Sequence, residues 1–354
     1  MKTTVTASHR TQPPNAQLPS AQNQPPARQR LHRWALVAVA LTLFPAVWAQ
    51  AGAVMGNPRH GLNSQPFSRI FVFGDSLSDT GNLFRLSGGF PPPPYFEGRF
   101  SNGRLWVEQL ADALCMSITP GDNYAVGGAT TGHFNSNNGR NGRIYPALLD
   151  EIASFTATRS AAEAEGALFV VWAGANDFFL ALTTGQDPQV LIGNGVGNTV
   201  QAIQQLWQAG ARHILVANVP DLGLTPYALG MNAGAPVTQL SAAYNEALSL
   251  ALDSLAAAGI STIRVDAFAT LRTMVTQPAQ FGFTNVTDQL IMAGGTAPGY
   301  LFWDPVHPTT QGHAVFAEAA ADSLISYFSP RQGKGTPPAR INALNGLVNA
   351  WDNN

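Results

Sequence analysis

The chain has 354 residues, of which 45% are apolar and 11% charged, with a formal net charge of −2. This composition is typical of a globular protein and excludes a disordered one. Residues 1–50 hold five basic residues and no acidic residue, so the rest of the chain carries 14 basic and 21 acidic residues. An acidic balance excludes the basic surface that nucleic-acid binding needs, and we expect no nucleic-acid partner.

Cysteine and histidine spacing excludes two further classes of site. Cys115 is the only cysteine in the sequence, so no internal disulfide can form. No Cys/His cluster has the spacing of metal ligands, and the HExxH pattern is absent. We therefore expect no metal site, and the stability must come from an apolar core.

Residues 1–51 are predicted to be a signal peptide with a disordered extension. Three arginines at positions 28, 30 and 33 precede an apolar run from Trp34 to Trp48, and Ala49-Gln50-Ala51 offers small residues for cleavage. A membrane anchor is the alternative, but about 15 apolar residues fall short of the roughly 20 that a spanning helix needs. We predict a secreted or periplasmic protein without a stable membrane span after cleavage, and a linker over residues 52–68.

A buried strand is predicted at Ile70–Phe73, and it stops at Gly74-Asp75-Ser76. A small polar residue just past a buried parallel strand lies where open α/β sheets place their chemistry. Ser76 would present its hydroxyl there, while Asp79 and Asn82 would hydrogen-bond nearby backbone and fix the loop. Taken alone, the pattern favours a capped turn with an idle serine.

The next segment is rich in proline and aromatic residues. Four consecutive prolines at 91–94 exclude a helix and predict a stiff extended segment. It is followed by Gly-Arg-Phe-Ser-Asn-Gly at 98–103 and by an amphipathic helix at 105–114. The Pro-rich segment is either a pocket wall beside Ser76 or a surface loop, and the residues favour neither.

Strands and helices alternate through the rest of the chain. Strands are predicted near residues 124, 170, 215 and 263, and helices from 199 to 210, 237 to 258 and 310 to 328. With the first strand, this alternation predicts a three-layer α/β/α sandwich with a five-stranded parallel sheet. The glycines at 193–197 follow no strand and lack GxGxxG spacing, so they predict a flexible loop instead of a nucleotide site. The apolar residues at 280–303 are either a substrate wall or core packing.

Two of the predicted strand ends carry residues that could stabilise negative charge. Gly127-Gly128 follows the strand near 124, and glycine lets backbone N–H groups point into a site. Asn176 follows the strand near 170, where its amide could face a developing oxyanion. Each could equally be an ordinary turn residue.

Asp304 and His307 lie three positions apart in a loop restricted by Pro305 and Pro308. A serine hydroxyl needs a base of near-neutral pKa, and that base needs a carboxylate to fix its tautomer. One rigid loop can supply both groups. His313 lies further on, in the predicted helix, and is expected to be structural.

Residues 74–82, Gly-Asp-Ser-Leu-Ser-Asp-Thr-Gly-Asn, resemble the first block of the GDSL (SGNH) family of serine esterases and lipases, and specifically its secreted bacterial type. Gly127-Gly128, Asn176 and Asp304-x-x-His307 resemble later blocks of the family, in the family's order. The resemblance covers roughly residues 69–328 and implies the family's flavodoxin-like strand order. It implies Ser76 as nucleophile, His307 as base and Asp304 as its orienting carboxylate. It also implies an oxyanion hole formed by the N–H of Ser76, the N–H of Gly128 (with Gly127 as the fallback) and the amide of Asn176.

The expected function is hydrolysis of a small-molecule or lipid carboxylic ester through an acyl-enzyme, without a metal or organic cofactor. One alternative is a phospholipase/acyltransferase that moves an acyl chain from a phospholipid to an alcohol. Another is a catalytically silent secreted binding protein. Residues 329–354 are expected to form a flexible tail. Neither the natural ester nor the oligomeric state follows from the sequence.

Overall fold

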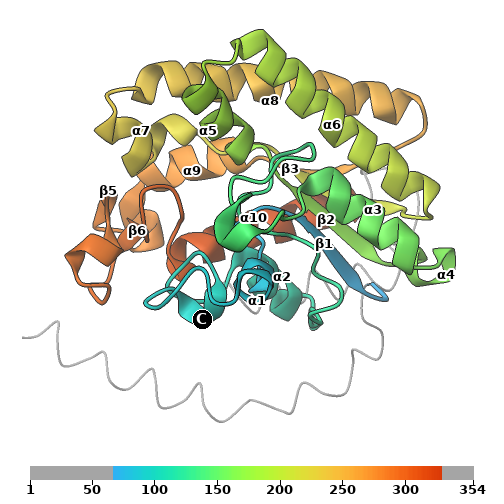
Figure 1. Ribbon diagram of the computed structural model, residues 1–354, viewed down its shortest axis with the longest axis horizontal. Helices are drawn as coiled ribbons and strands as arrows, with labels where there is room; N and C mark the ends of the chain where they lie inside the picture. Colours follow the sequence, from blue (N-terminus) through green and yellow to red (C-terminus); the bar gives the residue numbers. More distant parts are fainter. Residues whose placement is uncertain (1–66, 329–354) are drawn as a thin grey trace, which may run out of the picture. The chain divides into compact units, whose positions relative to one another are not determined.

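The computed structural model describes residues 67–328 (Figure 1). The predicted signal peptide, most of the linker and the C-terminal tail lie outside these residues. Four parallel strands form the main sheet in the order β1-β2-β3-β4. Their bounds are β1 (Ile70–Gly74), β2 (Leu168–Trp172), β3 (His213–Ala217) and β4 (Ile263–Val265).

Helices cover both faces of this sheet, which confirms the predicted α/β/α layering (Figure 1). Both faces of β1 are apolar and therefore need a cover. Ile70 and Val72 pack on one face of the sheet, and Phe71 and Phe73 pack on the other. Every residue of β1 and β2 is buried, as expected for parallel strands covered on both sides. The first face is covered by α2 (Trp106–Ala113), α9 (Ala267–Thr276) and α10 (Thr310–Phe328), and the second by α3 (Leu148–Thr158), α6 (Pro188–Gln208) and α8 (Gly234–Ala257).

The predicted five-stranded sheet is wrong by one strand, because the segment near residue 124 forms only an isolated bridge between Asn123 and Val72. A side chain from α3 interrupts the ladder at this edge. A continuing ladder would use the N–H of Gly74, but this group donates to the carboxylate of Glu151 at 2.7 Å. The other carboxylate oxygen accepts from Val126 N–H at 3.1 Å. Glu151 thus replaces one ladder bond between this edge segment and β1, although the N–H of Val126 also donates to the carbonyl of Gly74 at 3.0 Å.

The glycine-rich stretch at 193–197 is part of α6 and not the predicted loop. Asp187 caps this helix by accepting from the N–H of Gln189 at 2.7 Å, and Pro188 occupies its first turn. Gly195 is buried against Tyr244 of α8, where a Cβ would lie 2.6 Å from the tyrosine ring. Glycine serves close helix packing at this position.

Shorter elements complete the described chain. Residues 280–303 contain a small two-stranded parallel sheet that the sequence did not predict, and their buried large apolar side chains are Phe283, Leu290, Leu301, Phe302 and Trp303. No helix within residues 67–328 has both the length and the apolar character needed to cross a membrane. The remaining elements are α1 (Asn82–Ser87), α4 (Ala161–Ala164), α5 (Ala175–Thr184), α7 (Pro226–Gly230), β5 (Asn285–Gln289) and β6 (Tyr300–Phe302).

Candidate active site

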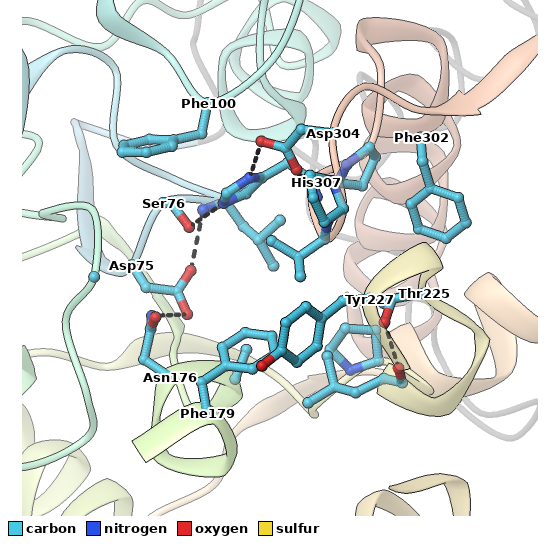
Figure 2. Close-up of a pocket in the computed structure, with 18 of the residues that line it drawn as sticks. Asp75, Ser76, Phe100, Asn176, Phe179, Thr225, Tyr227, Phe302, Asp304 and His307 are labelled. Atoms are coloured by element: carbon cyan, nitrogen blue, oxygen red, sulfur yellow. Dashed lines mark hydrogen bonds and ion pairs between the residues drawn. The ribbon is translucent and has the colours of Figure 1, made fainter. Parts of the chain in front are cut away.

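A pocket of about 420 Å³ opens at the carboxyl ends of the strands. Ser76 enters it from the loop after β1, Asn176 from the start of α5 just past β2, and His307 from the loop before α10. Parallel strands place these loops at one edge of the sheet, which is where open α/β sheets bind ligands. The structure therefore brings together residues that the sequence predicted from separate segments (Figure 2).

Ser76, His307 and Asp304 form a continuous hydrogen-bonded chain (Figure 2). The Oγ of Ser76 lies 2.7 Å from Nε2 of His307. The Nδ1 of His307 lies 2.6 Å from Oδ2 of Asp304. Because a carboxylate can only accept, Nδ1 carries the proton and Nε2 is free to accept from the serine hydroxyl.

The carboxylate of Asp304 is fixed by four donors. Its Oδ1 accepts the backbone N–H groups of Val306 and His307 at 2.9 and 2.8 Å. Its Oδ2 accepts from His307 Nδ1 and from the hydroxyl of Tyr95, the latter at 2.8 Å. Burial opposes ionisation of Asp304, but the charge of His307 and these hydrogen bonds outweigh it, so the pKa lies below its ordinary value. Asp304 is therefore held as an anion beside the imidazole.

His313 has a different environment from His307. It is fully buried on α10, and neither ring nitrogen has a hydrogen-bond partner among the described residues. Burial lowers the pKa of His313 to about 3, with a further contribution from the charge of His307. This histidine is a neutral core residue, as the sequence predicted.

Ser76 and Gly128 both line the pocket, and neither backbone N–H group has a hydrogen-bond partner within residues 67–328. Gly128 adopts a φ of 83°, which glycine tolerates and which turns its amide relative to Gly127. The N–H of Gly127 instead donates to the carboxylate of Asp79 at 2.8 Å. Of the two glycines, only Gly128 retains a free donor.

Asn176 contributes a side-chain amide to the same pocket. Its Nδ2 donates to the carbonyl of Ala129 at 3.0 Å and makes a longer contact of 3.4 Å with Asp75 Oδ2. Burial raises the pKa of Asp75 to about 7, against the opposing effects of the Leu77 N–H and of His307. The weak contact with Asp75 is the one that an incoming oxyanion could replace.

Buried carboxylates hold the loops that carry these donors. As predicted, Asp79 fixes its own loop, because it accepts from the N–H groups of Gly81, Asn82 and Leu83. Its bond to Gly127 also ties this loop to the glycine turn. Glu151 links the end of β1 to the same turn, and burial raises the pKa of both carboxyls. The sequence reasoning missed Glu151, since nothing local marks a helical glutamate as buried.

The pocket walls are largely apolar. Phe90 and Phe100 flank the four prolines at 91–94 and line the pocket, but the prolines themselves do not. From residues 280–303 only Phe302 lines it, so core packing accounts for most of that segment. Figure 2 shows Phe179 of α5 and Tyr227 of α7 across the pocket from Asp304. The sequence reasoning identified neither of these two aromatic residues.

The described residues thus form an α/β fold in which a serine, a histidine and a carboxylate converge in one pocket at the carboxyl ends of the strands. Residues 70–320 match the family model described as GDSL-like lipase/acylhydrolase. The chain belongs to this family, and it is a carboxylic ester hydrolase.

Several curated proteins are similar to this chain. A phosphatidylcholine-sterol acyltransferase of Aeromonas hydrophila is 29% identical over 324 residues, which cover 75% of this chain and 93% of that protein. An acetylesterase of Thermothelomyces thermophilus is 28% identical over 80% of this chain and 96% of its own length. A thermolabile hemolysin of Vibrio parahaemolyticus is 28% identical over 72% of this chain, and the chain spans only 63% of its length.

Proposed function

We propose that this protein is a secreted esterase or lipase that cleaves carboxylic esters through an acyl-enzyme on Ser76. The observation that carries the proposal is the unbroken chain of hydrogen bonds from Ser76 through His307 to Asp304 in an apolar pocket. Secretion is proposed from the basic, apolar and small-residue pattern of residues 28–51.

In the first half of the reaction, the Oγ of Ser76 attacks the ester carbonyl carbon while Nε2 of His307 takes the hydroxyl proton. The tetrahedral intermediate then expels the alcohol, which receives that proton from His307, and the acyl group stays on Ser76. Asp304 stabilises the imidazolium without being protonated itself. In the second half, water repeats these steps and releases the carboxylic acid.

The negative charge of each tetrahedral intermediate needs preorganised donors. The unpartnered N–H groups of Ser76 and Gly128, together with the amide of Asn176, support an oxyanion hole built from these three residues. One such donor is worth roughly 3 kcal/mol of transition-state stabilisation. The occupied N–H of Gly127 argues against that residue as the donor.

A second candidate is an acyltransferase that passes the acyl group to an alcohol in place of water. The similarity to an acyltransferase over 93% of that protein's length favours it. The same three residues serve both reactions, and the molecule that reaches the acyl-enzyme decides between them.

The first experiment is hydrolysis of p-nitrophenyl esters from acetate to palmitate by the mature protein and its Ser76→Ala variant. We expect activity that depends on Ser76, and its preferred chain length separates an esterase from a lipase. Equal turnover by Ser76→Ala would overturn the proposal. Adding an alcohol and measuring the transesterified product tests the acyltransferase.

A further inference from the structure

We propose that Tyr95 is a positioning residue of this site, whose hydroxyl holds the Asp304 carboxylate and moderates its pull on the His307 proton. The hydroxyl donates to Oδ2 of Asp304 at 2.8 Å, and the same oxygen accepts from His307 Nδ1 at 2.6 Å. The inference rests on the proposed roles of Ser76, His307 and Asp304. It also gives a function to the Pro-rich segment, whose prolines do not line the pocket.

Packing fixes the ring of Tyr95 in place. It meets Trp303 edge-on with ring centroids 5.9 Å apart, and it meets Phe100 at 6.1 Å. Phe100 in turn packs against the ring of His307 at 5.0 Å. One aromatic wall therefore braces both the base and the tyrosine that contacts its carboxylate. Such a wall limits the freedom of the hydroxyl to leave Asp304 for another partner.

The hydroxyl completes the hydrogen bonding of Asp304 Oδ2. Without it, His307 would be the only donor to that oxygen, because Val306 N–H and His307 N–H both bind Oδ1. More negative charge would then face the imidazole and favour its protonated form. Burial and the neighbouring charge of Asp304 raise the pKa of Tyr95 above its ordinary value, so the tyrosine remains a donor in alkaline solution.

Other titratable groups also face His307, and a change at Tyr95 leaves them in place. Asp75 faces it from the loop after β1, Asp304 from its own loop, and His313 from α10. None of the hydrogen bonds of Asp75 involves Tyr95, and His313 is buried without a partner among the described residues. A shift in the pH profile after removal of the hydroxyl therefore reports on the contact with Asp304.

The test compares the Tyr95→Phe variant with the wild type in the pH profile of kcat/KM for a soluble p-nitrophenyl ester. We expect the acidic limb to move upward by roughly half a pH unit. The kcat should fall several-fold with little change in KM, because the defect lies in the base and not in substrate binding. Thermal unfolding of each variant verifies that the assays use folded protein.

Tyr145→Phe is the matched control. Tyr145 packs in the same aromatic cluster, but its hydroxyl donates to the carbonyl of Arg140 at 3.1 Å and not to Asp304. We expect its acidic limb to coincide with that of the wild type. An equal shift in both variants would mean a general packing effect and would overturn the inference.

A double-mutant cycle tests whether Tyr95 acts through Asp304. In an Asp304→Asn background, Tyr95→Phe should add little further change to the profile. Additive effects, or an unshifted profile in Tyr95→Phe when Ser76→Ala is inactive, would overturn the inference and leave the proposed triad standing. Full activity of Ser76→Ala would instead overturn the proposed function, and this inference with it.

Discussion

The Nε2 atom of His307 lies 2.7 Å from the hydroxyl oxygen of Ser76, although 231 positions separate the two residues in the chain. Both lie on short loops that are held by buried carboxylates. The Ser76 loop is held by Asp79, and the His307 loop is held by Asp304. The donor–acceptor distance is already that of a general base with its nucleophile, so proton transfer needs no large rearrangement.

Replacing His307 and His313 in turn should show which histidine acts as the base and which only packs in the core. His307→Ala should lower kcat by about 10⁴-fold or more, because no other side chain within residues 67–328 is hydrogen-bonded to the Ser76 hydroxyl. Asp304→Asn should be less severe, since Asp304 orients and supports the charge of His307. Both are measured as kcat on a soluble ester, with circular dichroism to verify folding.

His313→Ala is the control for this comparison. It removes a fully buried imidazole from α10 and should lower the free energy of unfolding by a few kcal/mol through the cavity it leaves. The folded fraction should keep its kcat. If His313→Ala were as inactive as His307→Ala, the choice of base would be wrong.

Asn176→Ala tests the oxyanion hole. Loss of its amide should lower kcat by about 10²–10³-fold with little change in KM, because the donor acts on charge that forms only in the transition state. Asn218→Ala is a suitable control, since Asn218 also follows a strand but bonds Asp266 and does not line the pocket. Nearly full kcat in Asn176→Ala would remove this residue from the oxyanion hole.

Local pattern predicts much of this molecule, because the strands are short apolar runs and the site residues follow them directly. The run at 70–73 became β1 within a residue, the strand predicted near residue 170 became β2, and α10 has the predicted bounds. Ser76 and Asn176 are predictable for the same reason, whereas His307 is predicted from its spacing to Asp304 in a proline-restricted loop. Parallel strands bring their carboxyl ends to one edge, so motifs that end strands must meet there.

Contacts between distant residues account for what the sequence did not predict. Glu151 replaces a ladder partner of Gly74 beside the segment expected to form the fifth strand, yet its own helix has an ordinary pattern. Gly195 resembles a loop residue in the sequence, because the residue that requires a glycine there is Tyr244 on the distant helix α8. Neither cause is visible within the local window on which helix and strand patterns depend.

The glycines of α6 offer a direct test of that explanation. Gly195→Ala should destabilise the protein by about 1–3 kcal/mol, because a Cβ would lie 2.6 Å from the ring of Tyr244. Gly197→Ala lies two positions further on the same helix, with nothing within 4 Å of its Cβ, and should stabilise by up to about 1 kcal/mol. Urea unfolding measures both values. Equal stabilisation by the two variants would contradict the packing argument.

The buried carboxyl of Asp75 predicts a pH dependence of stability. Burial raises its pKa from 3.8 to about 7, so between these values the folded state binds a proton that the unfolded state has released. The contribution of Asp75 to stability is therefore complete below about pH 4 and declines as the pH rises to about 7. Asp75→Asn cannot lose that proton. The unfolding free energy of the variant minus that of the wild type should rise by a few kcal/mol over this range and then level off.

His313→Gln should show the opposite pH dependence of stability in the same experiment. The pKa of His313 falls from 6.5 to about 3 on folding, so the unfolded state binds the extra proton between these values. The wild type therefore loses stability as the pH falls through this range, and His313→Gln does not. The unfolding free energy of the variant minus that of the wild type should rise toward low pH for His313→Gln. The same difference should rise toward high pH for Asp75→Asn. Urea unfolding at several pH values measures both, and parallel curves would show that the two groups do not titrate as their burial requires.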